Sequence, residues 1–189
     1  MTARWERVPS VCHDCAVLDL DALAQGAQDG DADALERFVR AIQPDVWRFC
    51  VHLTRFDVAD DLAQESLVRV IEFLPRWNRG PALTWALGVA RNVCREHIRR
   101  VTRRRTDPVA EPTTAATPDH GDVVPVMLVL ASLPIDQREA IVLTQLIGLP
   151  YASAAAVIGC PIGTVRSRVA RGRNTLAIAL NPQSDSQSG

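Results

Sequence analysis

The sequence predicts an all-α fold built as two small helical domains joined by a flexible acidic linker. Apolar residues recur at helical spacing along most of the 189 residues, and the chain holds only four Phe and one Tyr. The patterned segments are separated by TDPVAEPTTAATPDHG (106–121), which is rich in Pro and Thr and has almost nothing to bury. The helices on the two sides of this linker are therefore expected to form separate domains.

The first domain is predicted at 19–105, after an N-terminal extension at 1–18 that is expected to be disordered. Its helices are expected at 19–29, 31–54, 57–74 and 82–104, with the loop PRWNRGP (75–81) before the last. Asp31, Asp33 and Asp57 are candidate N-caps, and Pro44 marks a kink or break in the second helix.

The second domain is predicted at 122–180, before a tail at 181–189 that is also expected to be disordered. Four short helices fit its pattern, at 122–132, 134–147, 150–158 and 162–179. Gly148 and Gly159 mark the breaks between the last three.

The charges are arranged in alternating stretches, although the formal net charge is only −1. Residues 81–106 carry seven Arg against one Glu, and residues 141–189 carry four Arg against one Asp. The stretches between and before them are acidic. The balance argues against a globally basic protein, but two separate basic patches are typical of nucleic-acid binding.

The composition disfavours several classes of protein. The N-terminus lacks the apolar core of a signal peptide, and no apolar run approaches the ~20 residues that span a bilayer, so a cytoplasmic protein without membrane contact is expected. Five cysteines, spread thinly, do not suggest a disulfide framework. Cys12-His13-Asp14-Cys15 is compatible with zinc binding or redox sensing, but without a second CxxC it favours a plain extension. No metal or cofactor is expected.

The last helix has the pattern of a DNA-reading helix. On a helical wheel, Val165, Val169, Gly172 and Leu176 form one inward stripe, and a Gly-Cys-Pro turn links the helix to its predecessor. This predicts a helix-turn-helix. Thr164, Ser167 and Arg171 face outward toward base edges, while Arg166, Arg168 and Arg173 flank them at positions suited to phosphates. The alternative is a solvated basic helix end.

The helix at 82–104 carries a second basic face. Arg91, Arg95, Arg99 and Arg103 recur every four residues, with Asn92 beside them, opposite a broad apolar side. Because like charges at this spacing repel, such a row suggests an anion along it rather than simple solvation. Trp77, Asn78 and Arg79 in the preceding loop suit unstacked bases, although Trp77 is equally compatible with the core.

The helix at 57–74 is the acidic counterpart. Its inward side is predicted to hold Ala59, Leu62, Ala63, Leu67, Val70, Ile71, Phe73 and Leu74. Its outward side holds Asp61, Gln64, Glu65, Val68 and Arg69, a mixture that suits docking to a basic protein partner as well as plain solvation. A magnesium site at Asp60, Asp61 and Glu65 is disfavoured because the two aspartates point about 100° apart.

Taken in order, three segments resemble the extracytoplasmic-function (group 4) sigma factors of bacterial RNA polymerase, of actinobacterial type. DDLAQESLVRVIEFL (60–74) is similar to their region 2.2, TWALGVARNVCREHIRR (84–100) to regions 2.3 and 2.4, and LPIDQREAIVLTQLIGLPYASAAAVIGCPIGTVRSRVARGR (133–173) to region 4. Ser153, Pro150, Ser66, Leu67 and Gly88 depart from the usual residues without breaking the pattern.

The resemblance implies a promoter-specificity subunit without catalysis of its own. The face with Asp61, Gln64, Glu65, Val68 and Arg69 would bind the β′ clamp helices of core RNA polymerase, and the second domain would rest on the β flap. The melted −10 element would lie on Trp77, Asn78, Arg79, Arg91, Asn92, Arg95 and Arg99. The −35 duplex would lie on Thr164, Arg166, Ser167, Arg168, Arg171 and Arg173. An anti-sigma factor is a further partner that the family suggests. A stand-alone helix-turn-helix repressor is the main alternative, and a Mg²⁺-dependent nucleic-acid enzyme the other.

Overall fold

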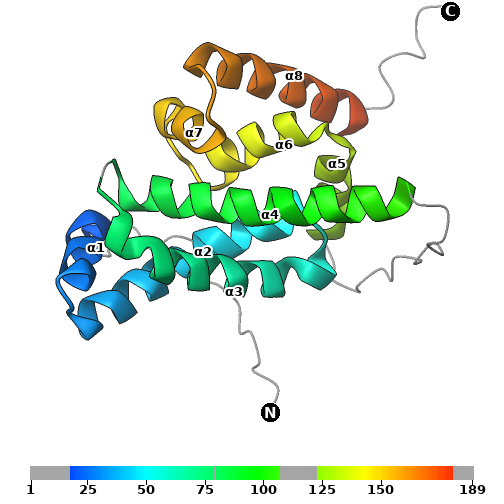
Figure 1. Cartoon of the computed structure of the whole chain (residues 1–189). Helices are drawn as coiled ribbons and strands as arrows, with labels where there is room; N and C mark the ends of the chain where they lie inside the picture. The colour runs from blue at the N-terminus through cyan, green and yellow to red at the C-terminus, as the bar shows by residue number, and fades with distance from the viewer. Residues whose placement is uncertain (1–17, 79, 107–122, 181–189) are drawn as a thin grey trace, which may run out of the picture.

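The computed structural model describes residues 18–78, 80–106 and 123–180, and in these ranges every regular element is a helix. The predicted extension with Cys12–Cys15, Arg79 of the loop, nearly all of the linker and the tail lie outside the described residues. The helices form two groups, and the all-α fold class predicted from the sequence is confirmed (Figure 1).

The first group holds α1 (Leu20–Gln28), α2 (Ala32–Leu53), α3 (Phe56–Phe73), the one-turn η1 (Leu74–Arg76) and α4 (Ala82–Thr106). Asp31 caps α2 as predicted, since its carboxylate accepts the backbone N–H groups of Asp33 and Ala34 at 2.9 and 3.1 Å. The predicted cap at Asp57 is wrong: α3 begins one residue earlier, and Asp57 instead accepts from Arg55.

The core of this group explains why Pro44 does not interrupt α2. Phe38, Ile42, Val46 and Phe49 recur at helical spacing along α2 and are fully buried. This stripe spans the proline and keeps both halves of the helix on one core. Small residues of α4, among them Ala86 and Ala90, let that helix approach closely.

The second group holds α5 (Val123–Ser132), α6 (Ile135–Ile141), a π-helical turn η2 (Val142–Leu146), α7 (Tyr151–Ile158) and α8 (Ile162–Leu180). Gly159 ends α7 in the left-handed conformation, with φ of 74°, and its N–H donates to the Ala155 carbonyl at 2.9 Å. Val165 and Val169 are buried behind the turn. The helix-turn-helix and the inward stripe of α8 are therefore as predicted.

The two groups are in contact. Figure 1 shows α4 lying between α2 and α3 on one side and the helices of the second group on the other, with α7 crossing it. Buried residues of both groups, such as Leu87 and Leu143, belong to one continuous apolar cluster. The two groups joined by the linker therefore also pack against each other.

The outer side of α3 is more apolar than predicted. Ile71 is predicted on its inward side but is 40% exposed, whereas Ser66 is buried, with its hydroxyl donating to the Leu62 carbonyl at 2.6 Å. Phe73 is also 40% exposed, but it is the last residue of α3 and lies at the same wheel angle as the buried Leu62. The broad inward sector taken from the wheel was wider than the strip that α2 and α4 cover.

The close approach of α8 and α6 generates a stability prediction. A Cβ atom at Gly172 would overlap Cδ1 of Ile141 and lie 3.3 Å from its Cγ1. Gly172→Ala is therefore expected to lower the free energy of unfolding by about 1–3 kcal/mol, despite the better helix propensity of Ala.

Urea unfolding followed by circular dichroism measures the effect. Gly163→Ala is the matched control, since the same helix leaves the added Cβ in open space. Equal stability of the two variants would contradict the packing argument.

Candidate nucleic-acid interface

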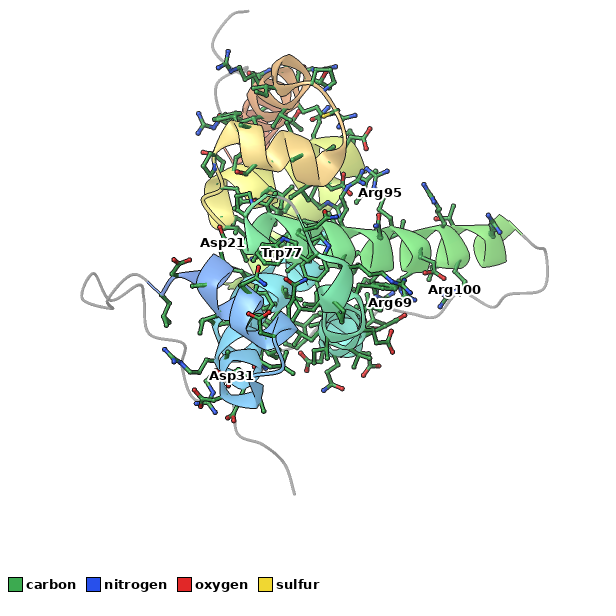
Figure 2. The ribbon with its side chains drawn as sticks, turned by 60° about the vertical axis from the view of Figure 1, so that its left-hand side comes forward. Asp21, Asp31, Arg69, Trp77, Arg95 and Arg100 are labelled. Carbon is green, nitrogen blue, oxygen red and sulfur yellow. The ribbon has the colours of Figure 1, made fainter. Side chains whose placement is uncertain are left out.

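The loop before α4 is held in place by α1. The Gln28 amide donates to the carbonyls of Leu74 and Trp77 at 2.7 and 2.6 Å. Asp21 accepts the backbone N–H of Ala82 at 2.6 Å and so supports the first turn of α4. Figure 2 shows Asp21 and Trp77 side by side at this end of the molecule. The loop conformation is therefore fixed by a helix about fifty residues earlier in the chain.

A cavity of about 410 Å³ lies at this loop. Its lining consists of Asp21, Gln25, Trp77, Asn78, Gly80 and Pro81. Carboxylate, amide and aromatic groups converge there, which suits a flat heterocycle with hydrogen-bonding edges. Trp77 and Asn78 were predicted for this role, but Asp21 and Gln25 were not, because only the fold brings α1 beside the loop.

Four of the six residues predicted for the outward face of α8 are exposed. Arg166, Ser167, Arg171 and Arg173 are exposed and Thr164 is half-buried. Arg171 lies along its own helix, with Nε donating to the Ser167 carbonyl at 3.3 Å.

Arg168 is the exception on this helix. Its guanidinium turns inward and donates to Asp136 of α6 at 3.1 Å, with Cys160 Sγ at 3.8 Å. Arg168 was predicted to flank the outward face, and in this arrangement a carboxylate of the neighbouring helix binds its guanidinium.

The arginine row of α4 faces the second group rather than open solvent. Arg95 donates through Nε and Nη2 to the two carboxylate oxygens of Glu139, at 2.6 and 2.7 Å, and through Nη2 also to Asp136. Arg91 Nε lies 3.2 Å from the same Glu139 carboxylate. We call Arg91, Arg95, Asp136, Glu139 and Arg168 the arginine–carboxylate cluster.

Burial makes this cluster electrostatically strong. The Glu139 side chain is fully buried, and Arg91 and Arg95 are only 18% and 22% exposed. The hydrogen bond to Glu139 raises the pKa of Arg95 above its usual range. The hydrogen bond from Arg95 is likewise the main reason why the pKa of Asp136 is lowered. Both groups are therefore held in their charged forms.

The cluster changes the interpretation of the predicted −10 residues. Arg91 and Arg95 are occupied, whereas Asn92 and Arg99 are exposed. Beyond the cluster, a cavity of about 350 Å³ is lined by Arg95, Ile98, Arg99, Thr102, Arg103 and Ile135. Asp136 and Glu139 of α6 thus supply part of the negative charge that is expected along the arginine row of α4. Sequence reasoning missed Glu139, because nothing local shows that its partners lie on α4.

A second link between the groups runs through Arg138. Its guanidinium donates to the Leu53 carbonyl of α2 at 3.3 Å and to the carbonyls of Ala131 and Leu133 at the end of α5. Carbonyls at helix ends carry partial negative charge, so they offset the burial that lowers the pKa of this arginine.

The outer face of α3 lies away from the cluster. Asp61, Gln64 and Val68 are exposed, while Glu65 and Arg69 are half-buried. Arg69 donates to Glu65 at 2.6 Å and to Glu96 of α4 at 3.3 Å. In Figure 2, Arg69 lies on the side of α4 opposite Arg95.

The sequence disfavours a magnesium site at Asp60, Asp61 and Glu65 of α3. Asp60 accepts a hydrogen bond from Trp47 at 2.6 Å. Within the part of the chain that the structure describes, no three His, Cys, Asp or Glu side chains are grouped to hold a metal ion. Nor does any helix of that part have the length and apolarity needed to cross a membrane.

Comparison with known proteins assigns both groups of helices to the sigma factor regions that the sequence resembles. Residues 38–105 match the family model "Sigma-70 region 2" and residues 124–176 match "Sigma-70, region 4". Over 168 residues the chain is 48% identical to the ECF RNA polymerase sigma factor SigC of Mycobacterium tuberculosis, covering 85% of this chain and 91% of that protein. The chain belongs to the extracytoplasmic-function sigma factors.

Other sigma factors agree with this. EcfG of Rhodopseudomonas palustris is 34% identical over 157 residues, which cover 78% of this chain and 86% of EcfG. The sigma factor RpoE of Bartonella quintana, solved with the anti-sigma factor NepR, superposes with a TM-score of 0.70 at 30% identity, covering 78% of this chain and 97% of RpoE. As an alternative sigma factor, the chain is a DNA-recognition subunit that directs RNA polymerase in transcription initiation. The stand-alone repressor is not favoured.

The lowered pKa of Asp136 gives a pH prediction. A carboxylate whose pKa is lowered by folding adds stability above its ordinary pKa, and this contribution is lost as the pH falls through the lowered value. Asp136→Asn is therefore expected to destabilise the sigma factor at neutral pH, and to do so progressively less as the pH is lowered to an acidic value below the ordinary Asp pKa of about 3.9.

Urea midpoints at both pH values test this, with Asp33→Asn as the control. Asp33 is exposed and its nearest cation, Arg37, lies 3.8 Å away. A loss of stability in Asp136→Asn that is the same at both pH values would contradict the ionic origin.

Proposed function

We propose that the first group, region 2, captures the −10 element as a melted strand. The observation that carries this is the cavity at the loop, whose lining combines Trp77, partly buried against the core, with the amides of Gln25 and Asn78 that suit a base edge. The exposed Asn92 and Arg99 continue from it along α4 toward the backbone of the strand. Arg91 and Arg95 join this surface once Asp136 and Glu139 are displaced.

The second group, region 4, is proposed to read the −35 element in the major groove. Its α8 follows a helix-turn-helix turn and presents Thr164, Ser167 and Arg171 outward, with Arg166 and Arg173 at the margins for phosphates. Arg168 is not available to the DNA while its guanidinium is bound to Asp136.

The outer face of α3 is proposed to dock on the β′ clamp helices of core polymerase, and region 4 on the β flap. Val68 is 54% exposed among Asp61, Gln64 and Glu65, and the exposed Ile71 extends the apolar part of the face. An apolar centre with a charged rim is typical of protein interfaces.

We further propose that the chain acts in the cytoplasm, beside the polymerase, and has no catalytic activity of its own. The anti-sigma factor in the RpoE structure supports a similar partner for this chain.

The proposal is tested by pull-down with core RNA polymerase followed by run-off transcription. Wild type should be retained by core and start transcripts, whereas Val68→Glu should lose both by disrupting the docking face. Val101→Glu, at a 38% exposed valine near the end of α4, is the control and should be retained. Duplex binding without retention on core would instead favour a repressor.

Region 4 yields a specificity prediction. Arg171→Ala should cost about 1–3 kcal/mol on the preferred −35 sequence and relax the preference at one base pair. Binding of duplex variants measured by fluorescence anisotropy gives both quantities. Arg40→Ala, an exposed arginine of α2 paired with Glu36, is the control. Equal weakening on every sequence would show that Arg171 contacts phosphate.

A further inference from the structure

One face of α1 holds both ends of the loop that shapes the cavity before α4. Asp21, Gln25 and Gln28 follow one another at spacings of four and three residues, so they lie on the same side of the helix. Gln28 binds the start of the loop, Asp21 binds its end, and Gln25 between them lines the cavity. The cavity is therefore built on α1 as much as on the loop itself.

Gln28 binds the loop through a single amide nitrogen. Its Nε2 donates to the Leu74 carbonyl at 2.7 Å and to the Trp77 carbonyl at 2.6 Å. These carbonyls lie at the two ends of η1, where the Trp77 N–H donates to the Leu74 carbonyl at 2.9 Å. A half-buried amide that binds two main-chain acceptors fixes the direction in which the chain leaves η1. The backbone position of Trp77, and of Asn78 after it, therefore depends on Gln28.

The other end of the loop depends on Asp21. Its Oδ1 accepts the N–H of Ala82, the first residue of α4, at 2.6 Å. N–H groups in the first turn of a helix lack a partner inside the helix, and the preceding Pro81 has no side-chain oxygen to cap them. Gly80, with φ of 72°, makes the turn between the two held ends.

The helix α1 is itself anchored, so it can act as a support. Leu23 and Ala24 are buried in the core of region 2, and a Cβ atom on Gly26 would lie 3.0 Å from Cβ of Ala34 on α2. Yet α1 precedes the segment that matches the region 2 family model, which begins at residue 38. The support of the loop thus comes from a part of the chain outside that match.

We propose that Gln28 is a positioning residue for −10 recognition, which holds Trp77 and Asn78 where they can distinguish one base from another. The inference rests on the proposed function, in which the cavity takes a base of the melted strand. Gln28 does not line the cavity, so it acts through the loop rather than on the base. A site that discriminates between ligands has to hold its groups within about 0.5 Å of the productive geometry. A loop with a glycine turn does not meet this tolerance by itself, and α1 supplies the restraint.

The test uses holoenzyme assembled from core RNA polymerase and the full chain. The probe is a pool of DNA in which a random duplex segment continues into a random single-stranded non-template segment. Molecules retained on the holoenzyme are sequenced, which gives the base preference at every position of both segments. Trp77→Ala identifies the single-strand position that the cavity reads, because this position should lose its preference in that variant.

Two substitutions of the same type are compared. Gln28→Met removes both hydrogen bonds to the loop while keeping an unbranched side chain of similar length that favours helix. Gln43→Met makes the same change at a half-buried glutamine of α2 and is the control. Gln28→Glu keeps the shape of the side chain but has no N–H to donate, and it serves if Gln28→Met fails to fold.

Wild type should prefer one base by about tenfold at the position that the cavity reads. Gln28→Met should reduce this preference to below about twofold, while the preferences in the duplex segment and the retention on core stay unchanged. Hydrogen exchange of the peptide covering residues 74–82 should become at least about fivefold faster in Gln28→Met and stay as in wild type in Gln43→Met. A purely structural role of Gln28 would instead weaken duplex and single-strand recognition together.

The inference is overturned by an unchanged preference at that position in a folded Gln28→Met or Gln28→Glu holoenzyme. An equal loss in Gln43→Met, or a parallel loss of the duplex preferences, overturns it as well. If wild type shows no base preference in the single strand, or Trp77→Ala keeps every preference, the proposed capture of a base in the cavity fails instead.

Discussion

The arrangement of the two sigma regions depends on one buried charge. Glu139 lies on α6 next to the buried Ala140, and its carboxylate contacts Arg95 of α4. Its solvation is replaced by Arg95 and Arg91. Removing one partner of such a pair is far more costly than the pair is stabilising, so the charge specifies which surfaces meet more than it adds stability. The apolar contact of α7 with α4 supplies the attraction, and Glu139 fixes the register.

The helix α4 can pack against both regions because the side chains on its two sides differ in size and charge. Ala86, Ala90 and Cys94 bring it close to α2 and α3, and Cys94 Sγ lies 3.5 Å from Cys50 Sγ in that core. The hydrogen bond with this neighbour, together with burial, raises the pKa of the Cys94 thiol, which keeps it an inert core residue. With one side fixed, the arginines project from a rigid support toward whichever anion is present. On a flexible helix, the guanidinium groups would not be held where they can bind either a carboxylate or a phosphate.

Local pattern was enough to predict the helices, the turn before α8 and its inward stripe, because these depend on periodicity and on Gly159. It was not enough where a distant partner decides. Arg166 and Arg168 flank opposite sides of the wheel, and only the structure shows that the side of Arg168 meets Asp136 of α6. Ile71 is predicted inward because the wheel gives the direction of a side chain without saying how wide the neighbouring surface is, and Phe73 is exposed because it is the last residue of α3. Asp21 and Gln25 could not be assigned to the loop cavity, since only the packing of α1 brings them there.

The charges of the cluster also limit how firmly the chain can stay closed. Three arginines face two carboxylates, so one positive charge remains uncompensated, and Arg99 lies exposed beyond it. The covered surface is therefore still attractive to a polyanion.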